Sequence, residues 1–250
     1  MGLFFKYLHE LVLIARHMGP VFAAGYFLKT VAALPEVLAA RSLGPVDMRV
    51  RENFSVRSHG SSFEFLAYAL PVVREIHLHG CYGFDPAKRY GVVVDLGANS
   101  GTFSVLAAKS AERVIAVECG RSDLKKLFDV TMHLNGVTNA VFINKAVAAS
   151  DGDGRISMRR LILDYAPDGV DFLKVDIEGA ESELFGRKPK WLYQVKQISM
   201  EVHPCFGADV GHIKNTLENN GFAVTFFAKD LRKVNGLGTG AMGYVRAVRL

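Results

Sequence analysis

The stretch VVVDLGANSGTFS, residues 92–104, carries an acid between an apolar run and two glycines. Gly97 and Gly101 allow a sharp turn, and a helix beginning near Asn99 would present amides with partial positive charge. A dinucleotide-binding turn has the pattern G-x-G-x-x-G, whereas Asp95 stands here where an extra glycine would help a pyrophosphate approach. A carboxylate at that position repels phosphate, so the stretch predicts a ligand held in another way.

A second acid, Glu118, ends the next apolar run, where a carboxylate can accept hydrogen bonds from both ribose hydroxyls. S-adenosylmethionine carries an ammonium, a carboxylate and a positive sulfonium. An acid attracts its positive groups, and the amino terminus of a helix beside that acid attracts its carboxylate. Taken singly, Asp95 could cap a turn and Glu118 could be a solvated strand end. Together the two acids favour S-adenosylmethionine over NAD and over a sheet edge without a ligand.

Further acid and base candidates follow two later apolar runs. DFLKVDIEGAE contains Asp176 and Glu178, and QISMEVHP ends in His203. A hydroxyl must lose its proton to accept a methyl group, and histidine has the side-chain pKa nearest neutrality. His203 is therefore the first candidate base, followed by Asp176 and Glu178, although Glu178 could equally be a favourable acid in a helix first turn. The three match no metal-ligand spacing, so no metal site is expected.

Lys174 lies in the same apolar run, where a buried ammonium needs a partner. The sequence predicts Glu201 of the neighbouring strand as that partner. The pair would be either an ion pair that fixes strand register or a part of the catalytic site.

Alternating elements must position these residues. From residue 91 onward, apolar runs alternate with segments of helical spacing, which indicates βαβ units and a doubly wound parallel α/β sheet. Ligands of such sheets bind at the carboxyl ends of the strands, where the candidate residues lie. Residues 222–230 and 243–250 have no helix between them and should pair antiparallel.

Residues 1–60 form a separate predicted domain, a helical cap with a short hairpin around Glu52 and Asn53, and residues 61–250 form the ligand-binding domain. A helix is expected over residues 63–80, with Gly80 as its stop. Charges and prolines interrupt the amino-terminal apolar segment, so neither a signal peptide nor a spanning helix is expected.

Polar positions in the first 17 residues recur at helical spacing and leave a wide apolar arc. The preferred interpretation is a cap packed on the main domain, and the alternative is a helix lying on a membrane surface. The first 45 residues favour an anionic surface because bases outnumber acids: Lys6, Arg16, Lys29 and Arg41 against Glu10 and Glu36.

The chain carries 30 lysines and arginines against 25 acids, a net charge of +5 that identifies no partner. Its basic clusters lack interleaved aromatic residues, which argues against nucleic acid. Three cysteines stand far apart without a CxxC pair, so we expect no disulfide framework, no zinc site and a reducing, cytoplasmic setting.

VVVDLGANSGTFS, VIAVECGRSDLKKLFDVTMHLNG, NKAVAASDGDG and DFLKVDIEGAE followed by ISMEVHP resemble the FkbM-type S-adenosylmethionine-dependent methyltransferases over about residues 80–205. The resemblance implies a seven-stranded Rossmann-like sheet of order 3-2-1-4-5-7-6 with an antiparallel last strand. It also implies O-methylation of a hydroxyl on a sugar, glycan, lipid-linked or natural-product acceptor. The predicted cofactor contacts are Asp95, Gly97, Ala98, Asn99, Gly101, Glu118, Cys119, Ala146 and Asp176.

Two features depart from the family pattern: Cys119 replaces the usual proline, and the connection SDGDGRISMRRLILDYAPDG is short. Three other functions are weighed against O-methylation: an RNA methyltransferase, a non-catalytic cofactor-binding module and an NAD-linked sugar oxidoreductase. The sequence gives no indication of oligomeric state.

Overall fold

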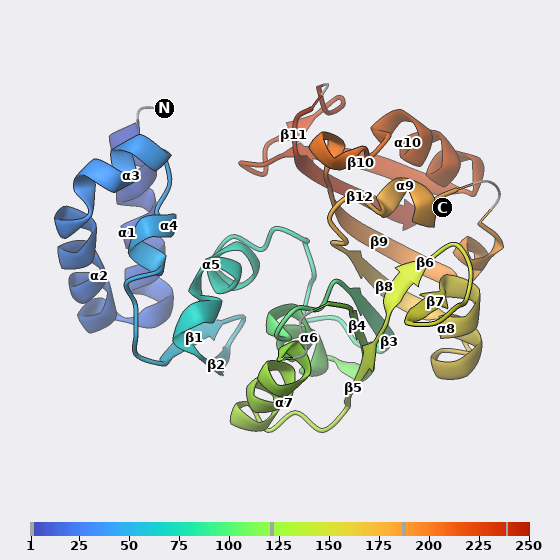
Figure 1. Cartoon of the computed structure of the whole chain (residues 1–250), viewed down its shortest axis with the longest axis horizontal. Coiled ribbons are helices and arrows are strands. Elements are labelled where there is room, and N and C mark those ends of the chain that lie inside the picture. Colours follow the sequence, from blue (N-terminus) through green and yellow to red (C-terminus); the bar gives the residue numbers. More distant parts are fainter. Residues whose placement is uncertain (1–2, 121–122, 187–188, 239) are drawn as a thin grey trace. The chain divides into compact units, whose positions relative to one another are not determined.

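Two compact units make up the computed structural model, which describes residues 3–120, 123–186, 189–238 and 240–250 (Figure 1). The first unit comprises Met1–Gly80 with His133–Gly136, and the second comprises Cys81–Met132 with Val137–Leu250.

The second unit is built on an eight-stranded sheet of order β11-β10-β12-β9-β8-β3-β4-β5. Five neighbouring strands, from β9 to β5 in that order, are parallel, whereas β12 pairs antiparallel with both β9 and β10. The predicted α/β class with a mixed central sheet is therefore confirmed. The strands are β3 (Tyr90–Leu96), β4 (Ala111–Glu118), β5 (Ala140–Asn144), β8 (Val170–Val175), β9 (Val195–Val202), β10 (Phe222–Ala228), β11 (Lys233–Val234) and β12 (Gly243–Arg249).

The sheet has one strand more than the seven expected. The extra strand is β11, two residues long, which pairs with the end of β10 because the chain turns back at Leu231, whose φ is +64°. Numbered along the chain without β11, the strands run 3-2-1-4-5-7-6.

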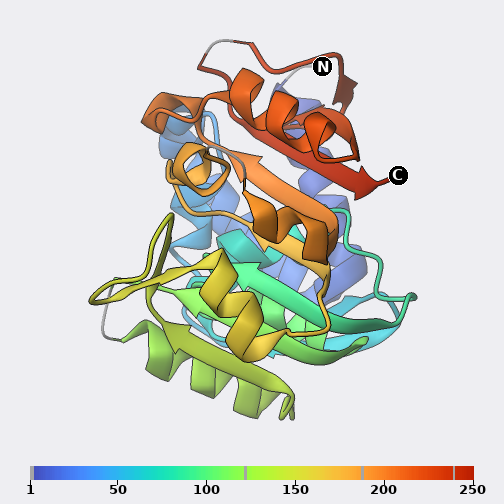
Figure 2. The same ribbon diagram turned by 90° about the vertical axis from the view of Figure 1, so that its right-hand side faces the viewer.

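Helices cover the sheet, and Figure 2 shows α8 and α10 in front of the strands. The helix α8 begins where the Ser157 hydroxyl accepts the amide of Arg160, and α10 begins where Asp209 accepts the amide of His212. The helical elements are α6 (Thr102–Ala108), α7 (Leu124–Leu134), α8 (Met158–Tyr165), α9 (Glu181–Leu184), α10 (Val210–Asn219) and the 3-10 turns η3 (Lys190–Gln194) and η4 (Pro204–Phe206). A short parallel pair, β6 (Ala146–Ala148) and β7 (Arg155–Ser157), lies outside the main sheet.

The strands β8 and β9 are buried along nearly their whole length, as the apolar runs predicted. Their core side chains, among them Leu173, Ile198 and Met200, have no exposed surface. The sheet interior is thus closed, and the polar side chains of these two strands that reach solvent, Asp171, Lys196 and Gln197, lie near the amino ends.

The first unit contains the amino-terminal helices and a hairpin. Its elements are α1 (Leu3–Met18), α2 (Pro20–Ala32), α3 (Leu34–Ala40), α4 (Gly44–Asp47), β1 (Phe54–Ser58), β2 (Ser61–Phe65), the 3-10 turn η1 (Ala67–Ala69), α5 (Leu70–Val73) and the π-turn η2 (Arg74–Leu78).

The hairpin turns at His59 and Gly60 and not at Glu52 and Asn53, so that prediction is wrong. Both turn residues have positive φ, +51° and +76°, as a two-residue type I′ turn requires. Because β2 then occupies residues 61–65, the helix predicted over 63–80 begins later, at η1, although the stop at Gly80 is present with φ +63°.

The boundary predicted between residues 60 and 61 falls at the end of this hairpin turn, whereas the chain divides after Gly80. The reason is that β2 pairs with β1 and packs its inner side chains inside the first unit. The rings of Phe63 and Phe65 lie 4.7 and 5.0 Å from that of His77.

A buried ion network holds the first unit together. Arg74 reaches Glu10 of α1 and Asp47 of α4, each at 2.7 Å, and the hydroxyl of Tyr26 donates to Asp47 at 2.5 Å. The ring of His79 lies 2.9 Å from Glu10. Burial works to raise the pKa of Glu10, but His79 and Arg74 outweigh it and lower that pKa to about 2.

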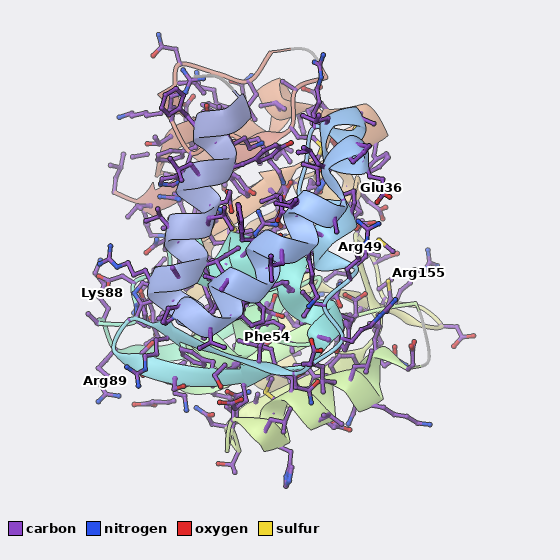
Figure 3. The ribbon with its side chains drawn as sticks, turned by 90° about the vertical axis from the view of Figure 1, so that its left-hand side faces the viewer. Glu36, Arg49, Phe54, Lys88, Arg89 and Arg155 are labelled. Atoms are coloured by element: carbon purple, nitrogen blue, oxygen red, sulfur yellow. The ribbon has the colours of Figure 1, made fainter. Side chains whose placement is uncertain are left out.

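Replacing Arg74 by methionine would leave Glu10 and Asp47 buried with too little positive charge. We expect Arg74→Met to lower the free energy of unfolding of the first unit by about 3–5 kcal/mol. The control is Arg49→Met, which removes a base from the exposed Glu36–Arg49 pair labelled in Figure 3 and should change that free energy by about 0–1 kcal/mol. Hydrogen exchange of residues 3–80 under increasing denaturant measures both, and equal effects would contradict the network's role.

Candidate active site

The candidate residues gather at one edge of the main sheet because parallel strands end on the same side. Glu118 is the last residue of β4, Asp176 follows β8, and His203 follows β9. The loop after β3, residues 97–101, lies at the same edge, so the topology brings together groups that are far apart in sequence.

The loop of residues 97–101 uses its own amides. Each of its five backbone N–H groups donates to a protein acceptor at 2.7–3.1 Å, and α6 begins only at Thr102. The expected display of free amides near Asn99 is therefore wrong, and a phosphate would find no amide of this loop unpaired. The acceptors are the carbonyl of Val117, which receives two, the carbonyl of Ala98, the side chain of Asn99 and the carboxylate of Glu118.

Glu118 is fixed against this loop. One carboxylate oxygen accepts the amide of Asn99 and the other accepts the amide of Cys119, both at 2.8 Å. Each oxygen retains a second lone pair for a ligand hydroxyl. Burial raises the pKa of Glu118, with the two amides opposing this effect. The neighbouring side chain of Cys119 is exposed.

Asp95 lies beneath the loop and not on its surface. Its side chain has no exposed area, one oxygen accepts the hydroxyl of Ser104 at 2.7 Å, and the other lies 3.1 Å from Lys174 Nζ. Lys174 also donates to the carbonyls of Leu96 and Gly97, at 3.2 and 2.7 Å. Asp95 thus holds Lys174 under the loop, which differs from the direct ligand contact predicted for it.

The predicted Lys174–Glu201 pair is absent from these contacts. Lys174 lies opposite Ser199 in the register of β8 and β9, so Glu201 falls beyond the end of β8. Glu201 pairs instead with Lys229, at 2.5 Å between Oε1 and Nζ. Burial works to lower the pKa of Lys174, but Asp95 and Asp176 outweigh it and raise that pKa, so this lysine remains charged.

The two glycines of the loop permit close packing of protein against protein. Gly97 has φ +74°, and a Cβ on it would lie 1.7 Å from the carbonyl oxygen of Asp176. Gly101 has φ +89°, and a Cβ there would lie 2.7–2.8 Å from side-chain atoms of Met132 and Phe128. Their positions are therefore explained by backbone approach to β8 and by packing of α7.

Asp176 is a partly exposed acid of the site, with 29 % of its side chain accessible. The hydroxyl of Tyr82 donates to it at 2.7 Å, and Lys174 lies 3.8 Å away. Tyr82 is almost fully buried, which raises its pKa and keeps it a neutral donor, and its ring centre lies 5.3 Å from Lys174 Nζ. These partners hold one oxygen of Asp176 and leave the other directed toward His203.

His203 is nearly buried and is oriented by a second acid. Its Nδ1 lies 2.9 Å from the fully buried Glu181, and the ring stacks on Phe206. Because a carboxylate only accepts hydrogen bonds, Nδ1 carries the hydrogen. The opposite nitrogen, Nε2, faces Asp176 at 3.9 Å and Glu201 at 3.8 Å.

The same groups could hold a cation. Asp176, Glu201 and His203 each offer one ligand atom, and these atoms lie within 4.8 Å of one another. The sequence predicts no metal site, and its three acid and base candidates contain Glu178 where this cluster contains Glu201. Glu178 is exposed and adopts a left-handed φ of +48° ahead of α9, outside this cluster.

Two further residues predicted to contact the cofactor, Ala98 and Ala146, lie shortly after the ends of β3 and β5. Ala98 is buried within the loop of residues 97–101. Ala146 is half-buried at the start of β6, shortly after β5, where its amide donates to the carbonyl of Gly154 at 2.8 Å.

Sequence reasoning missed four polar residues of this site: Tyr82, Ser104, Glu181 and Lys229. Glu181 closes the stretch DFLKVDIEGAE and could have been recognised as the acid that orients a histidine. The other three carry no pattern, because each reaches the site from a different element.

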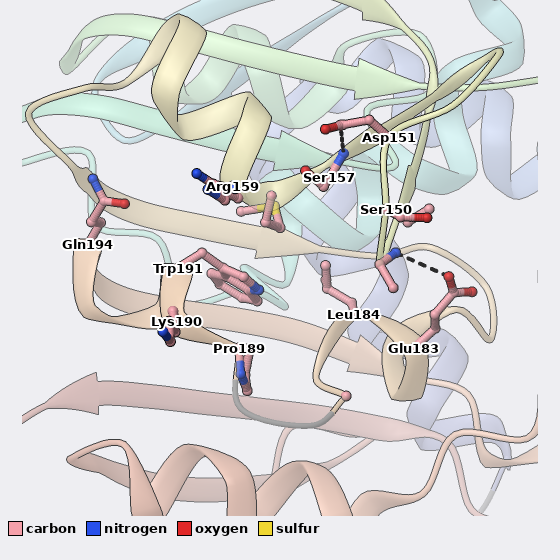
Figure 4. A pocket seen from close by; sticks show the side chains of 14 residues that line it. Ser150, Asp151, Ser157, Arg159, Glu183, Leu184, Pro189, Lys190, Trp191 and Gln194 are labelled. Atoms are coloured by element: carbon pink, nitrogen blue, oxygen red, sulfur yellow. Dashed lines mark hydrogen bonds between the residues drawn. The ribbon is translucent and has the colours of Figure 1, made fainter.

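A separate cavity of about 570 Å³ lies between β6, β7, α8, α9 and η3 (Figure 4). Trp191, Arg159 and Lys190 are among its lining residues. Two hydrogen bonds hold its wall. The carboxylate of Glu183 accepts the amide of Ala149 at 3.1 Å, and the carboxylate of Asp151 accepts the amide of Ser157 at 2.8 Å. None of the residues predicted for cofactor binding or catalysis lines this cavity.

The family model that matches this chain begins at β7 and includes both Asp176 and His203. Residues 155–224 match the methyltransferase FkbM domain. This match confirms the predicted FkbM-type family resemblance over that segment and supports a methyltransferase enzyme. No curated protein matches the chain.

Solved structures similar to this chain include an rRNA methylase and a putative methyltransferase. One is an rRNA methylase from Streptococcus thermophilus, at 13% identity and a TM-score of 0.48, covering 65% of this chain and 89% of that one. The other is a putative methyltransferase from Streptococcus mutans in complex with SAH, at 12% identity and a TM-score of 0.47, covering 65% and 90%.

A methyl group on Gly97 would collide with the Asp176 carbonyl, and the backbone would have to move. We expect Gly97→Ala to lower the free energy of unfolding of the second unit by more than about 4 kcal/mol. The matched control is Gly154→Ala, also at positive φ but with no atom within 4 Å of the added carbon, which should lose about 1–2 kcal/mol. Denaturant unfolding compares them, and equal losses would mean that the close approach is unimportant.

Proposed function

We propose that this chain is an S-adenosylmethionine-dependent methyltransferase that methylates a hydroxyl group. The observation that carries the proposal is the charge around the loop after β3: the amides of residues 97–101 bond within the protein, while Glu118 and Asp176 border the loop. Such surroundings favour a positively charged ligand over a phosphate. The methyltransferase FkbM match over residues 155–224 supports the same reaction class.

In this proposal Glu118 accepts the ribose hydroxyls through its remaining lone pairs. The loop residues Gly97, Ala98, Asn99 and Gly101 border the methionine end, and Asp176 lies toward the sulfonium. Asp95 acts indirectly, by holding Lys174 beneath the loop. The other expected neighbours of the cofactor are Cys119 and Ala146.

The acceptor is proposed to be a hydroxyl on a sugar, glycan, lipid-linked or natural-product molecule. Its oxygen forms a bond to the methyl carbon as the bond from that carbon to sulfur breaks, and S-adenosylhomocysteine leaves. The hydroxyl proton passes to His203 Nε2, while Glu181 holds Nδ1 and stabilises the imidazolium. Asp176, 3.9 Å from the same nitrogen, is the second candidate base, and the exposed position of Glu178 makes it the weakest of the three.

Cofactor affinity should depend on the ionised state of Glu118. We expect Glu118→Gln to weaken S-adenosylmethionine binding at pH 7.5 roughly ten-fold or more, because a charged acceptor is lost. Burial raises the pKa of Glu118 above its ordinary 4.5. As the pH is lowered, wild-type affinity should therefore begin to fall at a higher pH than an ordinary carboxylate would give. The variant should not show this fall. Titration calorimetry between pH 5 and 8 measures both.

The control for that measurement is Glu112→Gln, which alters an exposed acid on the same strand and should leave the affinity unchanged. Unaltered binding by Glu118→Gln, or tight binding of NAD without S-adenosylmethionine, would refute the cofactor assignment.

Methyl transfer should require His203. With methyl-labelled S-adenosylmethionine and fractionated glycans, lipids, RNA and small molecules, we expect His203→Ala to lose about 10²–10⁴-fold in turnover while cofactor affinity is retained. Glu181→Gln should also lower turnover, because the ring loses the charged acceptor that fixes Nδ1. Glu178→Gln serves as the control and should keep most activity.

Three results would change this assignment. Unchanged turnover in His203→Ala removes His203 from the mechanism. Inactivation by a chelator, reversed by Mn²⁺, would make His203 a metal ligand together with Asp176 and Glu201. Label in RNA alone would replace the proposed acceptor class.

A further inference from the structure

The helix α2 exposes an uncharged face. Its outward positions follow a spacing of three or four residues along the helix, and large side chains on it are extensively accessible: 86 % for Val21, 67 % for Leu28 and 55 % for Val31. A helix that only packed on a core would place such residues inward. The exposed residues of α2 are Pro20, Val21, Ala24, Phe27, Leu28, Val31 and Ala32.

Both neighbouring helices extend this surface, and Figure 3 shows the first unit from the side on which α1, α2 and α3 lie in front. We call the exposed large apolar residues of these helices the apolar helix face. They are Phe5, Leu8 and Val12 of α1, Val21, Phe27, Leu28 and Val31 of α2, and Leu34 and Leu38 of α3. α1 packs on α2, and α3 follows α2 after Ala33, so these residues share one group of helices. Large exposed apolar surfaces mark sites of association.

The charges of the first unit are distributed unevenly around this face. The acids Glu10 and Asp47 point inward and are neutralised by Arg74, so they contribute no exposed negative charge. An exposed acid nearby, Glu36, is paired with Arg49. Within residues 5–41 the remaining charged side chains are bases: Lys6, Arg16 and Arg41 are exposed, and Lys29 is half-buried. The exposed acids Glu52, Glu64 and Glu75 lie later in the chain, outside α1, α2 and α3. The helices that carry the apolar helix face are therefore basic.

A basic rim around an apolar face matches a membrane that carries anionic lipids. It fits a second copy of this chain less well, because a two-fold interface would bring the same bases together. Within the described ranges no single helix is long and apolar enough to cross a bilayer. By length and composition α2 and α3 would suffice only as a pair, and the pair is bent by 80°. This geometry suits helices lying in the plane of the headgroups.

We propose that the apolar helix face is a docking surface for an anionic lipid membrane. The large side chains of α1, α2 and α3 enter the boundary between headgroups and acyl chains, and the exposed bases contact the anionic headgroups. The proposal is independent of the methyl-transfer reaction, since it concerns only the first unit.

Flotation of the full chain with liposomes tests this directly. We expect co-flotation with vesicles of phosphatidylcholine containing 30 mol% phosphatidylserine, and much weaker flotation with phosphatidylcholine alone or at high salt. The variant Phe27→Ser with Leu28→Ser should reduce partitioning roughly ten-fold or more. Both sites are exposed, so circular dichroism and cofactor binding should remain unchanged.

The matched control is Leu163→Ser, which removes an equally exposed leucine, 63 % accessible, from α8 of the second unit and should float like wild type. Equal flotation of wild type and the Phe27/Leu28 variant would overturn the proposal. Absence of wild-type flotation would also overturn the proposal. This holds whether light scattering then finds a monomer or a dimer that the Phe27/Leu28 variant dissociates.

Discussion

The buried ammonium of Lys174 is the interaction on which the candidate site depends. It lies between Asp95 of β3 and Asp176 after β8, and it donates to two carbonyls at the end of β3. A charge in this interior is tolerable only with such partners, and they in turn fix the two strand ends relative to each other. The close contact of Gly97 with the Asp176 carbonyl completes the same junction.

The negative groups beside the loop after β3 follow from this junction. Asp95 is already paired with Lys174, while Glu118 and Asp176 can each accept a further hydrogen bond from a ligand. Beyond Asp176, Glu181 orients His203 so that Nε2 faces the same region. In the proposed function, cofactor recognition and proton removal would use groups at the ends of four neighbouring strands, β4, β3, β8 and β9, as expected where a doubly wound sheet carries its site.

Alternating apolar runs were enough to predict the sheet, because burial on both faces leaves a strong pattern in the sequence. They were not enough for the partner of Lys174, since a two-residue difference in register decides whether Glu201 lies beside it or beyond the strand. The hairpin was misplaced because two positive φ angles at His59 and Gly60 outweighed the apparent alternation around Glu52. Tyr82 reaches Asp176 across 94 residues, a contact that no local pattern encodes.

The internal bonding of the loop after β3 also bears on the kinetics of association. A loop whose five amides are already satisfied cannot fold around a guest by forming those bonds. Its shape is preorganised, so capture of a guest carries little entropic penalty from that segment and has no loop-ordering step to wait for. In the proposed function, residence time would then depend on the contacts that the ligand makes with the carboxylates of Glu118 and Asp176.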